Sequence, residues 1–254
     1  YLQMAKKAVS IKKKWHVVVD PGCGGAYNIG PKLLKEVGCK VTALNAQADG
    51  HFPARSSEPT ATSLKDLSDV VRVLGADIGV AFDGDADRVA FVDEKGVFVN
   101  FDRSLSGYAA YILKRNHGGV VVTNVEASMC FETMAKKFNG KTVRTKVGDI
   151  YVSEAIKRDE AVFGGEPCGA WVHPSQHFCP DGPLSSALFL MALEDEEKTV
   201  SEFIGEVPEY ITLRENISCP NELKKKAVKN VEESLKMEFK GYTDFSTIDG
   251  VRLA

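Results

Sequence analysis

Residues 78–88 of the 254-residue chain have the sequence IGVAFDGDADR. The apolar run Ile78–Phe82 predicts a fully buried strand, because a strand covered on both faces lacks polar alternation. Asp83, Asp85 and Asp87 follow it at alternate positions, so their carboxylates can converge on one point. Open α/β sheets hold their ligands in loops at the carboxyl ends of strands. This stretch therefore predicts an α/β sheet with a ligand site at its edge.

Three carboxylates this close repel one another unless a cation neutralises them. Hard oxygen ligands suit Mg²⁺ or Ca²⁺, and Mg²⁺ keeps coordination positions for water or a phosphate oxygen. We therefore predict a Mg²⁺ site at Asp83, Asp85 and Asp87, with Arg88 beside it. A calcium helix-loop-helix site is excluded, because it needs Gly where this chain has Arg88. A polar surface turn is the simpler alternative.

The rest of the chain alternates apolar runs with amphipathic stretches, which is typical of strands and crossover helices. We predict an α/β protein of two tandem domains with mixed sheets sandwiched by helices, plus a partial α+β C-terminal segment. At this length each domain can bury its own core. The expected parts are the tail of a helix in 1–14, one α/β domain in 15–102, a second in 103–208, and the partial segment in 209–254.

Individual elements follow from the same periodicity. Glu94-Lys95-Gly96 reads as a hairpin turn between two strands. Strands are expected at 15–20, 39–44, 78–82, 88–93, 97–101, 119–123, 142–145 and 161–164, and from residue 209. Helices are expected at 2–11, 30–37, 64–74, 104–114, 128–138, 150–157, 184–193, 200–204 and 221–237.

Composition excludes several classes of protein. An apolar fraction of 44% and a charged fraction of 26% argue against a disordered or fibrous chain. A formal net charge of -3 gives no basic surface for nucleic acid. No apolar run approaches the roughly 20 residues that span a bilayer, so we expect no membrane partner and a cytoplasmic protein. The six cysteines are irregularly spaced, which favours reduced thiols over a disulfide framework.

A second motif, GGEPCG at residues 164–169, follows the apolar run 161–163. Its glycines permit close approach of a ligand to Glu166. The simpler alternative is a carboxylate that caps a turn. Trp171, in the same region, is expected to pack in the core.

The motif Asp83-Gly84-Asp85-Ala86-Asp87-Arg88 resembles the metal-binding loop of the α-D-phosphohexomutases, which include phosphoglucomutase, phosphomannomutase and phosphoglucosamine mutase. The pair Asp20-Pro21, the run DGHFP at residues 49–53 and Glu58-Pro59-Thr60 resemble that family's second domain in order and spacing. The resemblance covers nearly all of the chain, as the family's second and third domains and the start of its fourth.

The resemblance implies roles for the second motif. Glu166 and Cys168 would contact adjacent sugar hydroxyls, between Gly165 and Gly169. The family usually has Ser where this chain has Cys168, and a thiol is a weaker hydrogen-bond partner. Lys146, in the segment TKVGD at residues 145–149, would meet the substrate phosphate. A solvated surface lysine is the alternative.

The resemblance also implies an activity. The family moves a phosphoryl group between the 1- and 6-positions of a hexose phosphate, through a bisphosphorylated intermediate and a phosphoserine, with Mg²⁺ as cofactor. This chain has no segment similar to the phosphoserine motif and no loop similar to the distal phosphate loop. We therefore expect a fragment that is inactive alone, whose partners are the hexose phosphate, the missing domains of the same polypeptide and, as a candidate, a second copy of the chain.

Three other interpretations remain open at this point. An aspartyl-phosphate phosphatase would use Asp83 as nucleophile and Asp85 as acid, but it needs Thr or Val where Asp87 stands. A non-catalytic fragment that binds sugar phosphate is the second alternative. The third is a zinc site formed by four residues whose spacing matches no known finger, Cys168, His173, His177 and Cys179.

Overall fold

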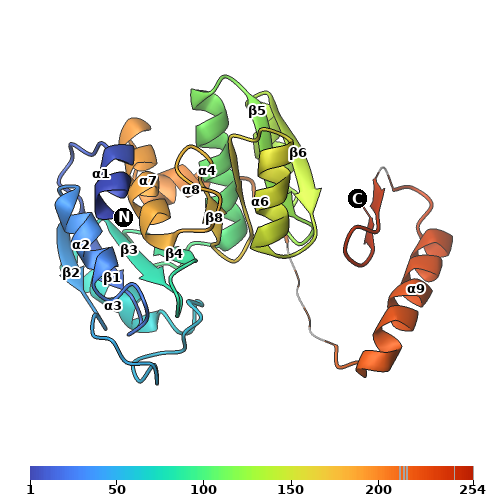
Figure 1. Cartoon of the computed structure of the whole chain (residues 1–254), viewed down its shortest axis with the longest axis horizontal. Helices are drawn as coiled ribbons and strands as arrows, with labels where there is room; N and C mark the ends of the chain where they lie inside the picture. Colours follow the sequence, from blue (N-terminus) through green and yellow to red (C-terminus); the bar gives the residue numbers. More distant parts are fainter. Residues whose placement is uncertain (212, 214, 216, 243, 254) are drawn as a thin grey trace.

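The computed structural model of the protein describes residues 1–211, 213, 215, 217–242 and 244–253. Two four-stranded sheets form its centre (Figure 1). The first has the order β2-β1-β3-β4. Its three parallel strands are β2 (Lys40–Ala43), β1 (His16–Asp20) and β3 (Ile78–Phe82), and β4 (Val89–Val92) runs antiparallel to β3. The two central strands, β1 and β3, are buried almost throughout, as their unbroken apolar runs predict.

The second sheet repeats this topology in the order β6-β5-β7-β8. Its parallel strands are β6 (Gly140–Thr145), β5 (Gly119–Asn124) and β7 (Phe163–Gly165), and the short β8 (Trp171–Val172) is antiparallel to β7. In both sheets, therefore, the connection from the third strand to the antiparallel edge strand lies at the same topological position. This position carries the two loops on which the site depends.

Helices cover both sheets, which confirms the predicted α/β class with mixed sheets. The helices of the described chain are α1 (Leu2–Ala8), α2 (Ile29–Glu36), α3 (Lys65–Leu74), α4 (Phe101–Arg115), α5 (Cys130–Lys137), α6 (Asp149–Arg158), α7 (Gly182–Asp195), α8 (Val200–Gly205) and α9 (Asn221–Glu238), of which α9 does not cover a sheet. Within the described part of the chain, none of these helices combines the length and the apolar character needed to cross a bilayer.

The main core is continuous between the two sheets, and α7 joins them (Figure 1). Nearly every residue of α7 is buried, as expected of a helix that is apolar all round. Phe189 of α7 stacks on Phe91 of β4 with ring centroids 4.2 Å apart, and it also meets Trp171 of β8 at 6.0 Å. The two domains therefore share this core through α7, while the opposite face of each sheet has a core of its own, around Val18 and Leu67 in the first domain and around Val122 and Ile156 in the second.

Three local expectations are corrected. Val97–Phe101 is not a strand: Phe98 makes only an isolated bridge to Val92, and α4 begins at Phe101 rather than at residue 104. The physical reason is Asn100, whose side chain accepts hydrogen bonds from the backbone N–H groups of Asp102 and Arg103 and so caps the helix. Strand β8 was not predicted.

The C-terminal segment contains α9, which has no buried residue, and an antiparallel pair of β9 (Phe245–Ser246) and β10 (Arg252–Leu253). Figure 1 shows α9 at the side of the two sheets. The strand expected from residue 209 falls partly on residues 212, 214 and 216, which lie outside the described residues.

Candidate active site

The acidic loop, residues 83–88, connects β3 to β4. One carboxylate oxygen from each of Asp83, Asp85 and Asp87 lies within 4.8 Å of the others. Among the described residues, these three form the one group of at least three His, Cys, Asp or Glu side chains that could hold a metal ion. Asp83 is 5% exposed, whereas Asp85 is open to solvent. The predicted ligands are thus brought together, with one open side.

The electrostatics of the acidic loop favour a bound cation. Burial, with the neighbouring carboxylates of Asp87 and Asp85, raises the pKa of Asp83 to about 7, although a backbone hydrogen bond from Arg88 opposes this rise. Burial also raises the pKa of Asp87. Asp87 Oδ1 is buried without a hydrogen-bond partner, although Arg88 Nε lies 3.5 Å away. An orphaned carboxylate oxygen among three acids fits a hard cation such as Mg²⁺.

Arg88 closes the loop. Its backbone N–H donates to Asp83 Oδ1 at 3.1 Å, and its Nε lies 3.7 Å from Asp83 Oδ2. Its Nη1 donates to both carboxylate oxygens of Glu58 at 2.9 Å. The guanidinium is therefore held by three carboxylates at the mouth of the acidic loop.

The glutamate loop, residues 165–170, connects β7 to β8 and is as closely held. Glu166 is 7% exposed. Its Oε1 accepts a hydrogen bond from Asn124 Nδ2 at 2.7 Å and another from the Gly148 backbone N–H at 2.7 Å. The Glu166 N–H donates to the Ala170 carbonyl at 2.9 Å, which closes the loop as a tight turn. Two donors thus satisfy one carboxylate oxygen and fix the orientation of the other.

The two loops are joined by their backbones. Arg88 and Ala170 form an antiparallel bridge, and the Val89 N–H donates to the Gly169 carbonyl at 3.0 Å. Gly169 has a φ of +95°, and a Cβ there would lie 2.3 Å from the Val89 carbonyl oxygen, so only glycine permits this approach. The acidic and glutamate loops therefore form one rigid unit.

A cleft of about 470 Å³ opens between these loops. Both contribute to its lining, with Asp87 and Arg88 from the acidic loop and Glu166 and Cys168 from the glutamate loop. Its lining comprises Asp87, Arg88, Asn124, Glu126, Val147, Gly148, Asp149, Glu166, Pro167, Cys168 and Ala170. Arg88, Glu166 and Cys168 were all predicted to belong to one site, and the structure brings them together.

Lys146 is placed differently from the other predicted residues. It is exposed and is absent from the cleft lining, although its neighbours Val147 and Gly148 belong to that lining. Its Nζ lies 5.7 Å from the centroid of the Tyr151 ring. It therefore stands at the rim of the cleft.

The proposed zinc cluster does not form. His173 is buried and pairs with the Ser185 hydroxyl at 2.8 Å, and His177 contacts the Asp181 carboxylate at 3.0 Å. Cys168 lines the cleft, and burial raises the pKa of its thiol to about 11, so the thiol stays protonated at neutral pH. Within the described residues these four side chains make no metal-binding group. All six cysteines are free, as predicted.

Several cleft residues were missed from the sequence. Asn124 ends β5, and Asp149 begins α6 directly after Gly148. Their signal is positional, because both stand at the carboxyl end of a strand or just beyond it. Glu126 has the same signal, because it lies two residues beyond the end of β5.

Fold and site together define an α/β protein of two tandem domains in which the acidic loop and the glutamate loop face one cleft. The chain matches the family models for Phosphoglucomutase/phosphomannomutase, alpha/beta/alpha domain II over residues 1–96 and domain III over residues 100–210. The chain belongs to the phosphoglucomutase/phosphomannomutase family, which confirms the resemblance drawn from its motifs.

Two curated relatives of the chain are named as phosphoglucosamine mutases. The chain is 46% identical over 237 residues to a probable phosphoglucosamine mutase of Methanopyrus kandleri, covering 93% of this chain and 52% of that protein. It is 42% identical over 258 residues to the phosphoglucosamine mutase of Methanococcus vannielii, covering 100% of this chain and 57% of that protein. The chain thus spans about half the length of these relatives.

Solved structures agree on the fold. A phosphoglucomutase/phosphomannomutase family protein from Burkholderia thailandensis is 25% identical with a TM-score of 0.86, covering 100% of this chain and 54% of that one. An N-acetylphosphoglucosamine mutase of Aspergillus fumigatus, solved in complex with GlcNAc-6P and magnesium, is 17% identical with a TM-score of 0.58, covering 94% of this chain and 60% of that one.

Proposed function

We propose that the chain supplies the metal-binding and sugar-binding half of a Mg²⁺-dependent phosphohexomutase whose substrate is a glucosamine phosphate. The observation that carries this proposal is the single cleft lined by both loops. The names of the two curated relatives, both phosphoglucosamine mutases, support the amino sugar. The lining supports it too, because it places the carboxylates of Glu126 and Asp149, which have no other role in this proposal, where a sugar ammonium could be neutralised.

The residues take separate roles in this proposal. Asp83, Asp85 and Asp87 would hold Mg²⁺, which supplies positive charge to the transferring phosphoryl group. Arg88 would bind phosphate oxygens with a fork of donors, since its guanidinium already lies at the mouth of the cleft. Lys146 at the rim would meet the substrate phosphate as a mobile charge.

The glutamate loop would set the sugar's orientation. Asn124 and Gly148 fix one carboxylate oxygen of Glu166, which leaves the other to accept a hydrogen bond from a sugar hydroxyl. Cys168 would donate a weak hydrogen bond from its protonated thiol to the adjacent hydroxyl.

The phosphoryl donor would come from a further segment of a longer polypeptide. In the first half-reaction the donor's P–O bond breaks, a P–O bond to the free sugar hydroxyl forms, and the proton of that hydroxyl passes to the freed donor oxygen. In the second half-reaction the sugar's original P–O bond breaks, the P–O bond to the donor oxygen forms again, and the proton of the donor hydroxyl passes to the freed sugar oxygen. Two such transfers through a bisphosphorylated sugar move the phosphate between the 1- and 6-positions with no net loss.

This proposal is tested by following glucosamine 6-phosphate by ³¹P NMR, with Mg²⁺ and a trace of the 1,6-bisphosphate, in the full-length protein that contains this chain. We expect the 1-phosphate to appear and EDTA to stop its formation. We expect no turnover by residues 1–254 alone. Release of inorganic phosphate without interconversion would instead favour the phosphatase alternative, and preference for glucose or mannose 6-phosphate would overturn the amino-sugar assignment.

A further inference from the structure

Arg55 lies buried directly beneath the acidic loop. Its side chain is 4% exposed, although it comes from a segment rich in Pro and Ser. Its Nη2 donates to the carbonyl oxygen of Phe82 at 2.6 Å and to that of Asp20 at 3.1 Å. Phe82 is the last residue of β3 and immediately precedes Asp83. Arg55 therefore holds the backbone at the point where the acidic loop begins.

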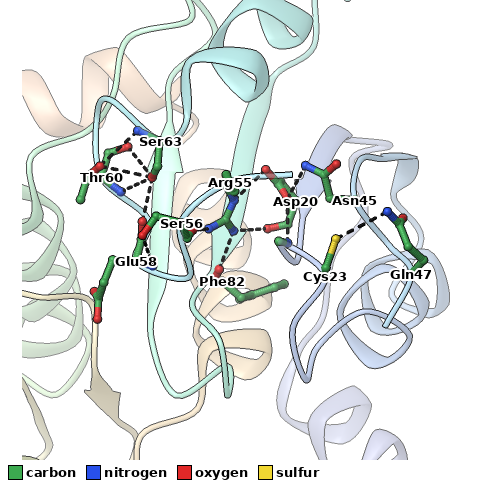
Figure 2. A network of polar contacts seen from close by, with 11 residues as sticks. Asp20, Cys23, Asn45, Gln47, Arg55, Ser56, Glu58, Thr60, Ser63 and Phe82 are labelled. Carbon is green, nitrogen blue, oxygen red and sulfur yellow. Dashed lines mark hydrogen bonds and ion pairs between the residues drawn. The ribbon is translucent and has the colours of Figure 1, made fainter. Parts of the chain in front are cut away.

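The charge of Arg55 is balanced by Asp20, whose side chain is 2% exposed. Arg55 Nε donates to Asp20 Oδ2 at 3.0 Å. Asp20 Oδ1 accepts from the Gly22 N–H at 2.7 Å and from Asn45 Nδ2 at 3.1 Å (Figure 2). Both carboxylate oxygens of Asp20 therefore have donors, which is the condition under which a buried ion pair is tolerated.

Asp20 links Arg55 to a second support of the acidic loop. Asp20 ends β1 and leads into the turn of residues 21–25. In that turn the Gly25 N–H donates to the Gly84 carbonyl at 2.9 Å. A Cβ on Gly24 would lie 2.6 Å from the same oxygen, so the turn packs directly on the backbone between Asp83 and Asp85. The pair thus fixes the loop at two points, residues 82 and 84.

The segment that carries Arg55 continues along the same loop. A Cβ on Gly84 would lie 3.3 Å from the Phe52 ring and 3.4 Å from Ser57 Cβ, so residues 52–57 cover the loop from outside. Glu58 then pairs with Arg88 at the far end. One segment therefore follows the acidic loop from its first residue to its last.

We propose that Arg55, paired with Asp20, is a positioning residue that fixes the backbone of residues 82–84 so that the carboxylates of Asp83 and Asp85 converge on the metal. This inference rests on the proposed Mg²⁺ site. Apolar side chains can often replace a buried ion pair without loss of stability. The fold alone therefore does not require Arg55 and Asp20 to be charged. The place of this pair at the foot of the acidic loop gives it a specific task.

The test measures Mg²⁺ binding by isothermal titration calorimetry on the full chain, with no substrate present. Arg55→Met is expected to weaken Mg²⁺ binding at least 10-fold, in the range seen for residues that support metal ligands. Arg55→Lys keeps the charge but loses the planar fork, so it should lose about 3-fold. The double variant Asp20→Asn with Arg55→Met removes the unpaired buried charge and keeps the experiment informative if the single variant fails to fold.

Leu67→Ala is the matched control, because Leu67 is fully buried in α3 against β3 and its loss destabilises the same sheet without touching the acidic loop. Its Mg²⁺ affinity should stay within 2-fold of the parent. If the Arg55 variants fold and bind Mg²⁺ as tightly as Leu67→Ala does, the positioning role is wrong. If the parent chain itself binds no Mg²⁺, the proposed metal site fails first, which is a different result.

Discussion

The acidic loop and the glutamate loop occupy the same place in two sheets of identical strand order. They differ in how the negative charge of their carboxylates is balanced, because the carboxylate of the glutamate loop accepts hydrogen bonds that a buried oxygen of the acidic loop lacks. Glu166 receives two short hydrogen bonds on one oxygen. In the acidic loop, Asp87 Oδ1 is buried with no donor, and burial together with two neighbouring acids raises the pKa of Asp83 to about 7. One topological position thus yields a preorganised hydrogen-bond acceptor in one sheet and a site that needs an external cation in the other.

The largest effect should come from the acidic loop. Asp83→Ala removes the most buried of the three carboxylates and should weaken Mg²⁺ binding by about 100-fold or more. Calorimetric titration of Mg²⁺ measures this change. Asp69→Ala, at a half-buried residue of α3 whose one ion pair in the described chain is with Arg72, should leave Mg²⁺ binding intact. Equal losses in both variants would contradict the comparison.

Gly169→Ala should break the junction between the loops. The new Cβ would meet the Val89 carbonyl, and the residue would be held at a φ of +95°, so we expect a loss of about 2–4 kcal/mol in the free energy of unfolding. Urea unfolding measures it. Gly38→Ala is a matched control, because Gly38 has a φ of +102° with open space around it, and it should lose only about 1 kcal/mol.

Glu166→Gln should separate the loops functionally. The amide oxygen keeps the hydrogen bonds from Asn124 and Gly148, but an NH₂ group replaces the second oxygen, which would accept a hydrogen bond from the sugar hydroxyl. The affinity for hexose phosphate should therefore fall roughly 10-fold. Mg²⁺ affinity should not change. Fluorescence or calorimetric titrations of both ligands check this, with Glu154→Gln on the exposed face of α6 as control. A parallel loss of Mg²⁺ binding would show that the loops are not separate in function.

The metal-free protein should show two opposed pH dependences. Burial raises the pKa of Asp83 from 3.8 to about 7, so the folded state binds this proton more tightly and stability falls as pH rises between those values. Burial lowers the pKa of His173, behind the glutamate loop, from 6.5 to about 3, so stability falls as pH drops through that interval. Each slope is at most about 1.4 kcal/mol per pH unit.

Two variants separate the contributions of Asp83 and His173 to the pH dependence of stability, measured by urea unfolding from pH 4.5 to 6.5. Asp83→Asn should make stability rise more steeply with pH, because the opposing carboxylate is gone. His173→Gln should make stability fall as pH rises, because the Asp83 carboxylate then acts without the opposing histidine. An unchanged pH profile in either variant would mean that the assigned residue does not titrate in this way.

Much of the fold could be predicted because the signals are local. Ile78–Phe82 is a strand with the predicted bounds, since an unbroken apolar run enters a polar loop at Asp83. The strand predicted at residues 97–101 was wrong, because the apolar residues there suggest a strand whereas Asn100 caps the start of α4. Strand β8 has only two residues, too few for a periodic signal. The position of α7 between both sheets is a tertiary property that no local pattern shows.

In the candidate site, too, the residues that could be predicted are those with a local signal in the sequence. Asp83, Asp85 and Asp87 could be predicted because their spacing alone brings them together, and Glu166 because glycines flank it. Arg55 could not, since an arginine in a Pro- and Ser-rich loop normally lies in solvent. Its burial follows from Asp20, which is distant in sequence and becomes its neighbour only in the folded chain.

We infer that equivalent loops of the two sheets have separate tasks, the acidic loop binding the metal and the glutamate loop the sugar. Crystals of the protein grown with Mn²⁺, an oxygen-seeking substitute for Mg²⁺, and a hexose phosphate would test it by anomalous diffraction. The account predicts one manganese peak among Asp83, Asp85 and Asp87, with the sugar hydroxyls on Glu166. A manganese peak at Glu166, or none at the three aspartates, would contradict it.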